Sequence, residues 1–304
     1  MTHAPSGEQF EIAFGKQRAT IVEVGAGIRE YLDGEREVLQ SYALEDICDG
    51  AHGAPLIPWP NRLADGRYRF EDVDHQLALS EPVKQNAIHG LLRWRPWRMS
   101  EREPHRVVMS TRLYPQPGYP FALDVSIAYE LSERGLVVAT TAANIGKRAC
   151  PYGAGQHPYI SPGDGLIDDC LLELPARTRV LTDDERQLPS GKESVQGRDF
   201  DFSRPRQLGR LKLDSAFTDL VRDADGHAVT RLTCKDGTRI ELWVDEHHKF
   251  IELYSGDTLA PSRRRRGLGV EPMTCAPNAF QSGDGLVRLE PGESLTARWG
   301  VCLR

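Results

Sequence analysis

Apolar and polar residues alternate at every second position in segments that recur along the whole of this 304-residue chain. The clearest examples are residues 122–131 (ALDVSIAYEL) and the closing segment 295–303 (LTARWGVCL). Strict alternation is the pattern of a β-strand with one buried face. Similar short runs occur at 10–14, 18–24, 106–113, 135–143, 179–182, 228–234, 238–245 and 250–255.

Helical signals are weak by comparison. No capped segment of ten or more residues has a 3.6-residue period, and no Gly-rich phosphate loop is present. Gly, Pro, Asp and Asn clusters separate the predicted strands at intervals typical of β-sandwiches. We therefore predict an all-β fold in which residues 1–304 form a single antiparallel domain of two large stacked sheets. Residues 183–206 are the least patterned, and we expect them to run over the surface.

Composition excludes several classes of function. The net charge is -6 and charges of both signs are mixed, so the basic face that nucleic-acid binding requires is not present. The one basic run, Arg263–Arg266, is short and is interpreted as solvated loop charge. The six cysteines show neither zinc-ligand spacing nor a dense disulfide framework. With no membrane-length apolar run and no signal-peptide pattern, we expect a cytoplasmic protein without a membrane partner.

One stretch, residues 53–97, collects the parts of a small-molecule pocket. It combines a Pro-stiffened approach, an Asn-Arg pair, a histidine followed by glycine, and three tryptophans. Any one of these residues alone also fits a Pro-rich turn or a core histidine, but together they favour a site. The candidate residues are Trp59, Asn61, Arg62, His89, Trp94 and Trp97.

Three other segments each place an ionisable residue at the edge of a predicted strand. His157 lies in YGAGQHPYI and also fits a satisfied core histidine, whereas Asp214 in KLDSAF fits a turn acid equally well. Glu271, between Val270 and Pro272, is harder to explain structurally, because a carboxylate in apolar surroundings needs a partner or a raised pKa. The remaining histidines are predicted to lie at the surface: His52, His75, His105, His227, His247 and His248.

Taken in order, PWPNR, NAIHG, GQHPY, LDSAF and GVEP resemble the motifs of the aldose 1-epimerase (galactose mutarotase) family, and the likeness covers nearly the entire chain. The resemblance implies a β-supersandwich that interconverts the α and β anomers of a free aldose without a cofactor or metal. It implies Glu271 as the base, His157 as the acid and His89 as a second catalytic or orienting imidazole. Arg62 and Asp214 would then bind sugar hydroxyls.

Further contacts are expected around these groups. Asn61 adds a hydrogen-bonding amide, while Trp59, Trp94, Trp97 and Tyr159 are candidate platforms for the sugar's C–H face. Two departures from the better-known galactose mutarotases, Gln156 in place of Asn and Met273 in place of Gln, leave the identity of the sugar open. The expected partner is a small-molecule aldose, and the protein is expected to be a monomer or a homodimer.

A carboxylate and an imidazole suit this reaction, in which one group takes the anomeric hydroxyl proton while the other protonates the ring oxygen. We expect burial to raise the pKa of the carboxylate, and the carboxylate's charge to hold the imidazole protonated.

Four alternatives stay open at this point. The same fold could serve as a sugar-binding sensor without turnover, or as a metal enzyme using two histidines and a carboxylate. Glu271 and Asp214 could act as the paired carboxylates of a glycosidase. The substrate could also be a hexose 6-phosphate bound by Arg93, Arg95 or the 263–266 arginines.

Overall fold

The computed structural model describes residues 4–304, and strands dominate that range. Its helical segments are one short α-helix, α1 (Ala279–Ser282), and single 3-10 turns at Asp49–Ala51, Pro82–Lys84 and Ile167–Asp169. The prediction of an all-β chain without long helices is confirmed. None of the helices in the described range has the length and apolarity to cross a bilayer.

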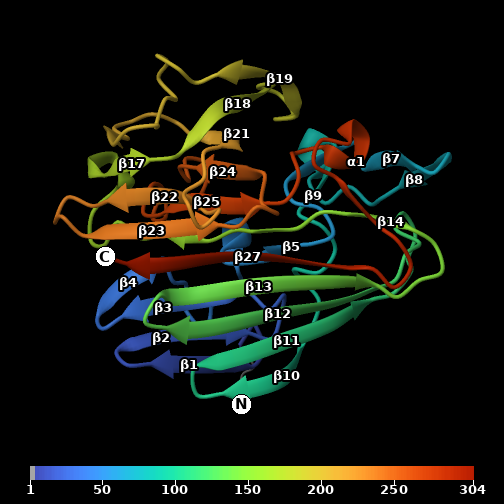
Figure 1. Ribbon diagram of the computed structural model, residues 1–304, viewed down its shortest axis with the longest axis horizontal. Helices are drawn as coiled ribbons and strands as arrows, with labels where there is room; N and C mark the ends of the chain where they lie inside the picture. Colours follow the sequence, from blue (N-terminus) through green and yellow to red (C-terminus); the bar gives the residue numbers. More distant parts are fainter. Residues whose placement is uncertain (1–3) are drawn as a thin grey trace.

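Two large antiparallel sheets make up the fold (Figure 1). The twelve-stranded sheet has the order β1 (Gln9–Phe14), β2 (Gln17–Val22), β3 (Ile28–Asp33), β4 (Arg36–Leu39), β16 (Tyr159–Ile160), β25 (Leu268–Met273), β24 (Phe250–Tyr254), β21 (Asp214–Leu220), β18 (Ala176–Thr182) and β19 (Pro189–Ser194). Two further strands attach at its centre, where β15 (Gly155–Gln156) pairs with both β25 and β5 (Pro55–Leu56).

The second sheet has nine strands and crosses the front of the view in Figure 1. Its order is β10 (Arg98–Glu103), β11 (Arg106–Leu113), β12 (Leu123–Ser132), β13 (Gly135–Asn144), β27 (Ser294–Leu303), β23 (Arg239–Val244), β22 (Ala228–Thr233), β17 (Leu171–Glu173) and β20 (Arg206–Gln207). Three two-stranded pairs complete the set: β14 (Cys150–Tyr152) with β26 (Val287–Leu289), β6 (Arg62–Ala64) with β9 (Asn86–Ile88), and β7 (Arg67–Phe70) with β8 (Val73–Gln76).

The core lies between the two sheets, and the alternating pattern of the sequence produces it. On β12, every second residue from Leu123 to Leu131 is buried, and β1 and β2 pack against this strand. Tyr129 of β12 also donates a hydrogen bond across the layers to the carbonyl of Ala26, at 2.6 Å. Apolar side chains of both sheets therefore form one continuous buried cluster.

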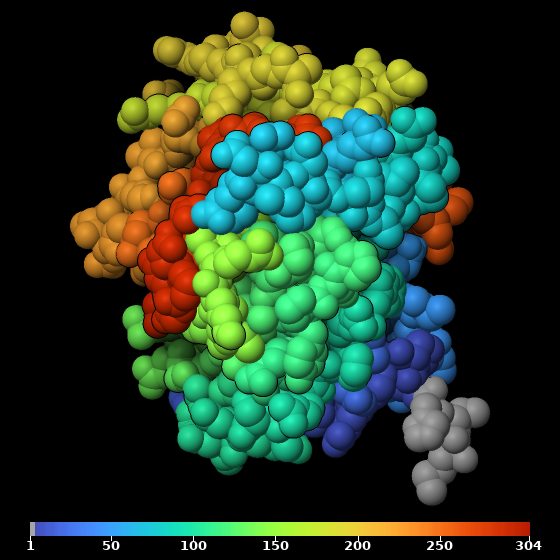
Figure 2. Space-filling model, turned by 90° about the vertical axis from the view of Figure 1, so that its right-hand side faces the viewer, coloured from blue at the N-terminus to red at the C-terminus, as the bar shows by residue number. Residues whose placement is uncertain are grey.

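The strands at the middle of the large sheet differ from the rest, because all six residues of β25 are buried. One face of this region packs on the core, and the segment 47–94 lies over the other face. Figure 2 shows part of that segment, in cyan, below the yellow atoms at the top of the view and bordered by red atoms of the C-terminal part of the chain. Polar contacts join them: Arg186 bonds the carbonyl of Gln85, and Gln281 bonds that of Arg67.

Residues 183–206 are mostly exposed, as predicted, but they are not a structureless excursion. They contain β19, which pairs with β18, and residues before β19 reach the covered face described above. The alternation that would have predicted β19 is missing because its PSGKES sequence carries no apolar residue on either face.

Candidate active site

A cavity of about 710 Å³ lies between the middle of the large sheet and the segment that covers it. Its strand wall, as we name it, consists of Asp214 of β21, Tyr254 of β24, Glu271 of β25 and His157 between β15 and β16. The opposite loop wall consists of Asn61, Arg62, Glu81, Lys84 and His89. Other lining residues are Ile47, Cys48, Asp49, Gly50, Ala51, Ser80, Ile88, Arg93, Trp94, Tyr159, Gln187, Thr258 and Leu259.

His157 and Glu271 meet in this cavity, with 3.1 Å between Nε2 and Oε1. His157 is only 5% exposed and Glu271 only 2%. Backbone hydrogen bonds fix the histidine, because its N–H donates to Ala54 and its carbonyl accepts from Gly53. The other oxygen of Glu271 and Nδ1 of His157 have no hydrogen-bond partner within residues 4–304. Unpartnered buried polar atoms are costly, so their position at a cavity indicates a ligand site.

Burial sets the protonation of this pair. It lowers the pKa of His157 to about 3, and it raises the pKa of Glu271 well above the usual range, with a further rise from the charge of Asp214. The expected rise for the carboxylate is therefore present. The expectation of a protonated imidazole is wrong, because burial lowers the pKa of His157 and the charge of Arg93 lowers it further. These directions favour the neutral form of each group, with the one proton of the pair on Glu271.

A stack of rings supports His157 from behind. Tyr159 lies parallel to His157 at 4.8 Å between ring centroids, and His52 lies parallel to Tyr159 at 4.0 Å. The Tyr159 hydroxyl donates to the carbonyl of Gly50 at 2.8 Å. Because Tyr159 stacks on both His157 and His52, its ring supports the imidazole, and its role as a platform for a sugar face stays a prediction.

The surface prediction for His52 is wrong, because this residue is 1% exposed and its Nδ1 contacts Arg263. His248, also predicted at the surface, is buried and paired with Asp245. Both lie next to turns in the sequence, and that context hid the side-chain burial.

His89 approaches the pair from the loop wall. Its ring is edge-on to that of His157 at 5.5 Å, and its backbone N–H donates to the carbonyl of Asn61. Burial also lowers the pKa of His89 well below its usual value. The next residue must be glycine: Gly90 has φ +69°, and a Cβ there would lie 2.0 Å from the carbonyl oxygen of Ile57.

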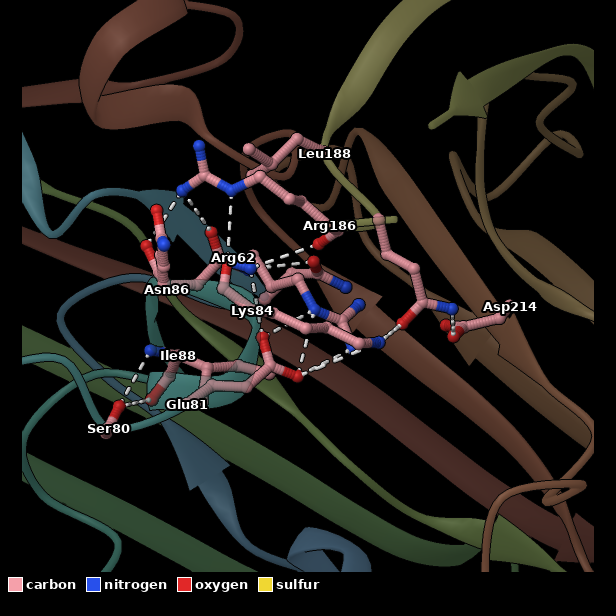
Figure 3. A network of polar contacts seen from close by, with 12 residues as sticks. Arg62, Ser80, Glu81, Lys84, Asn86, Ile88, Arg186, Leu188 and Asp214 are labelled. Atoms are coloured by element: carbon pink, nitrogen blue, oxygen red, sulfur yellow. Dashed lines mark hydrogen bonds and ion pairs between the residues drawn. The ribbon is translucent and has the colours of Figure 1, made fainter. Parts of the chain in front are cut away.

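The guanidinium of Arg62 does not present all of its N–H donors to the cavity, because two of them bind Glu81. Its Nε donates to one Glu81 oxygen at 2.9 Å and its Nη2 to the other at 3.1 Å, as Figure 3 shows. Asn86 also donates to Glu81, at 3.0 Å. This network holds the Arg62 guanidinium in one orientation at the cavity edge.

Asp214 is tied to the loop wall through a residue from the 183–188 segment. Gln187 donates to Asp214 at 2.5 Å and accepts from Lys84, so one side chain bridges an acid of the strand wall and a cation of the loop wall (Figure 3). Arg186 anchors the bridge by donating to the carbonyls of Lys84 and Gln85. Glu81, Lys84 and Gln187 were not predicted from the sequence, where they lie in polar loops without an apolar context.

The tryptophans separate into two groups. Trp59 and Trp97 are buried in the core, Trp59 against Phe280, and neither lines the cavity in the described range. The interpretation of Trp59 as a sugar platform is thus at odds with its place in the fold. Trp94 does line the cavity, where it is 53% exposed beside Arg93.

The two departures from the mutarotase motifs occupy packed positions beside the site. Gln156 bonds Tyr129 and Trp299 between the sheets. Met273 packs in a small buried apolar cluster that includes Phe250 and Val180. Neither residue lines the cavity in the described range, so both substitutions change packing around the site and not its surface.

One further buried acid, Glu252 on β24, lies directly opposite Glu271 of β25. The sequence carried a signal for it: in FIELY a carboxylate stands between two large apolar residues of a strand, as Glu271 does in GVEP. Within residues 4–304, no cluster of three or more His, Cys, Asp or Glu side chains has the geometry to hold a metal ion.

Comparison with known proteins identifies the family of the chain. Residues 8–301 match the family model described as aldose 1-epimerase. An uncharacterized protein of Escherichia coli K12, YihR, is 37% identical over 295 residues, which are 95% of this chain and 91% of the relative. The aldose 1-epimerase of the same organism is 26% identical over 241 residues, 72% of this chain and 66% of that protein.

A solved structure of similar shape is that of a Caenorhabditis elegans homologue of galactose mutarotase and aldose epimerases. It has a TM-score of 0.85 and 20% identity, and the match covers 98% of each chain. At this identity the likeness concerns the fold alone, which is the galactose mutarotase-like β-sandwich. From the family match over almost its full length, the chain belongs to the aldose 1-epimerase family.

Proposed function

We propose that this protein is an aldose 1-epimerase that interconverts the α and β anomers of a free hexose such as glucose or galactose. The family supports a mutarotase-type isomerase in general. The observation that carries the proposal is the 3.1 Å contact between His157 and Glu271 inside a sugar-sized cavity, with unpartnered atoms on both residues.

The proposed mechanism uses the single proton of this pair. Bound sugar separates the two groups, and the shared proton resides on His157. Glu271 takes the proton of the anomeric hydroxyl while His157 donates its proton to the ring oxygen, and the C1–O5 bond breaks to give the open aldehyde. After rotation about C1–C2, His157 recovers the proton of the C5 hydroxyl as its oxygen attacks the other face of the carbonyl. Glu271 returns its proton to O1, so both groups end as they began.

The remaining residues orient the ring. His89 lies edge-on to His157 and has Nδ1 free of any partner in the described range, so it is suited to bind a hydroxyl near the reacting atoms. Arg62 and Asp214 bind further hydroxyls, and Asn61 contributes at the cavity edge. Because Arg62 and Asp214 are already held by Glu81 and Gln187, little side-chain entropy is lost on binding.

The experiment is to follow the anomeric equilibration of freshly dissolved α-D-glucose and α-D-galactose by polarimetry or exchange NMR. We expect the protein to accelerate equilibration, and we expect E271Q and H157N to abolish the acceleration. Equilibration at the buffer-only rate for a panel of free aldoses, together with measurable sugar binding, would favour the sensor alternative.

A second candidate substrate is a hexose 6-phosphate, and one observation favours it. Arg93 lines the cavity and forms no ion pair within residues 4–304, whereas Arg95 bonds Gln116 and lies outside the lining. In the basic run, Arg265 is paired with Asp168 and Asp257. A half-buried free guanidinium suits a phosphate.

Exchange NMR on a free hexose and its 6-phosphate, with R93M and R95M as a matched pair, separates the two substrates. If the phosphorylated sugar is the substrate, R93M raises its KM and R95M does not. If R93M leaves both sugars unaffected, the phosphate candidate fails and the free hexose stands.

A further inference from the structure

Glu252 lies at the centre of a group of three carboxyl side chains on neighbouring strands. In the antiparallel register it is directly opposite Glu271 of β25 on one side and Ala216 of β21 on the other. Asp214 lies two residues before Ala216, so all three acids project from the same face of the sheet. Glu271 is directly opposed to Glu252, with Cβ atoms about 5 Å apart, whereas Asp214 is a diagonal neighbour at about 7–8 Å, a separation that long side chains still bridge.

Unlike its two neighbours, Glu252 does not line the cavity. It is 3% exposed, and its Oε2 has no hydrogen-bond partner within residues 4–304. A sugar in the cavity would meet Glu271 and Asp214 first. Glu252 is therefore a buried acid that the proposed reaction does not use and that bound substrate does not satisfy.

The surrounding charges do not support an ionised Glu252. Three charged or titratable groups face it: Asp214 and Glu271 from the neighbouring strands, and Arg62 from β6. Arg62 is the one cation among them, and its fork is already engaged by Glu81. Burial raises the pKa of Glu252 well above its usual value, and the charges of Asp214 and Glu271 raise it further.

Asp214 is the natural acceptor for the retained proton. One of its oxygens, Oδ2, already accepts from Gln187, and the charge of Asp214 contributes to the raised pKa of Glu252. A protonated carboxyl both donates and accepts, which a carboxylate cannot do. Asp214 would then be held from two sides, by Gln187 at the cavity and by Glu252 on the neighbouring strand.

We propose that Glu252 is a positioning residue that stays protonated at neutral pH and donates a hydrogen bond to Asp214, fixing that carboxylate for sugar binding. The proposal rests on the proposed function only for the identity of the ligand. It assigns Glu252 no contact with the substrate and no part in the proton transfers.

The first test compares two variants of matched length, E252Q and E252M. Gln keeps a donor for Asp214, whereas Met keeps the volume and removes the donor. We expect E252M to raise the KM for the sugar about tenfold with a smaller change in kcat, and E252Q to restore a KM close to that of the wild type. The positioning role is wrong if both variants fold and E252Q has a KM as high as that of E252M. It is also wrong if E252M binds the sugar as well as E252Q does.

The second test reads the proton directly and does not require activity. Infrared spectra at neutral pH should contain a protonated carboxylic acid band that E252Q removes, and E271Q separates this band from that of Glu271. A spectrum in which E252Q removes no acid band would overturn the proposal.

The same proton makes the stability of the protein depend on pH. A raised pKa stabilises the folded state fully below the ordinary pKa of glutamate, and that stability is lost as pH rises towards the folded-state pKa. Glutamine has no proton to lose, so the melting temperature of E252Q should rise relative to that of the wild type as the pH increases above the ordinary pKa of glutamate. If the melting temperature of E252Q does not rise relative to that of the wild type as the pH increases, the proposal of a retained proton is contradicted.

These tests keep the two proposals apart. If the wild type equilibrates no aldose, the proposed function fails, yet the infrared and melting results still decide the state of Glu252. In that case the dissociation constant of glucose, measured by ligand-observed NMR, replaces KM in the comparison of E252Q with E252M. If the wild type is active but E252Q retains the acid band, only the inference about Glu252 fails.

Discussion

The two walls of the cavity differ in how their ionisable side chains are compensated. The strand wall presents His157 and Glu271 with burial so complete that it shifts both pKa values towards the neutral forms. The loop wall presents Arg62 and Glu81, which remain charged and compensate each other through a forked ion pair. In the proposed mechanism, the two groups that exchange protons are therefore buried on or beside strands without full charge compensation, whereas Arg62 is compensated by Glu81 before the sugar binds.

The largest effect is expected from a substitution in the strand wall. E271Q keeps the shape of the side chain but removes the base, so kcat should fall by about 10²–10⁴-fold. The measurement is anomer exchange by NMR at saturating sugar. E81Q on the loop wall is the control, and we expect its effect to fall mainly on KM. Equal losses of kcat in both variants would mean that the two walls do not divide chemistry from binding.

A smaller effect is expected from R62K. Lysine retains the charge but cannot form the fork with Glu81, so the guanidinium's orientation is lost. We expect kcat/KM to fall about 10–100-fold, chiefly through KM, since hydrogen bonds to charged groups contribute about 1.5–3 kcal/mol. Steady-state kinetics over a range of sugar concentrations would check this, and an effect confined to kcat would contradict it.

The two walls also predict a pH profile. The pair is active with one proton, so kcat/KM should be flat through neutral pH and should fall on the alkaline side as Glu271 loses its proton. The charge of Asp214 raises the pKa of Glu271, so D214N should move this alkaline limb to lower pH. An unmoved or upward-shifted limb would show that Asp214 does not act on Glu271 electrostatically.

The smallest effect is expected at the end of the loop wall. Lys84 reaches Asp214 only through Gln187 and is partly exposed, so K84M should raise KM by less than about fivefold. The increase should weaken further at high salt, because exposed charges are screened. A loss as large as that of R62K would indicate a direct contact between Lys84 and the substrate.

The sequence predicted the parts of this molecule that depend on local pattern. Alternation along β12 and β27 was enough to predict an all-β sandwich, and apolar neighbours of Glu271 were enough to predict a perturbed carboxylate. Of the candidate residues, eight line the cavity: Asn61, Arg62, His89, Trp94, His157, Tyr159, Asp214 and Glu271.

Features set by tertiary contacts were beyond that reasoning. A Pro-bracketed tryptophan looks the same whether it faces a ligand or, like Trp59, packs on Phe280. Nothing near His52 in the sequence predicts its stacking on Tyr159, more than a hundred residues away. Gln187 was missed for the same reason, because its partners Lys84 and Asp214 come from two distant segments.

The bridge formed by Gln187 has a consequence for engineering. The short stretch 183–188 is anchored by Arg186 to the backbone of residues 84 and 85 and contributes no residue to the His157–Glu271 pair. Under the proposed function, exchanging this stretch for one of different sequence would change the bridge to Asp214 at the cavity edge without altering a residue of the His157–Glu271 contact. A library confined to these six positions would therefore test whether this part of the rim influences the choice of sugar.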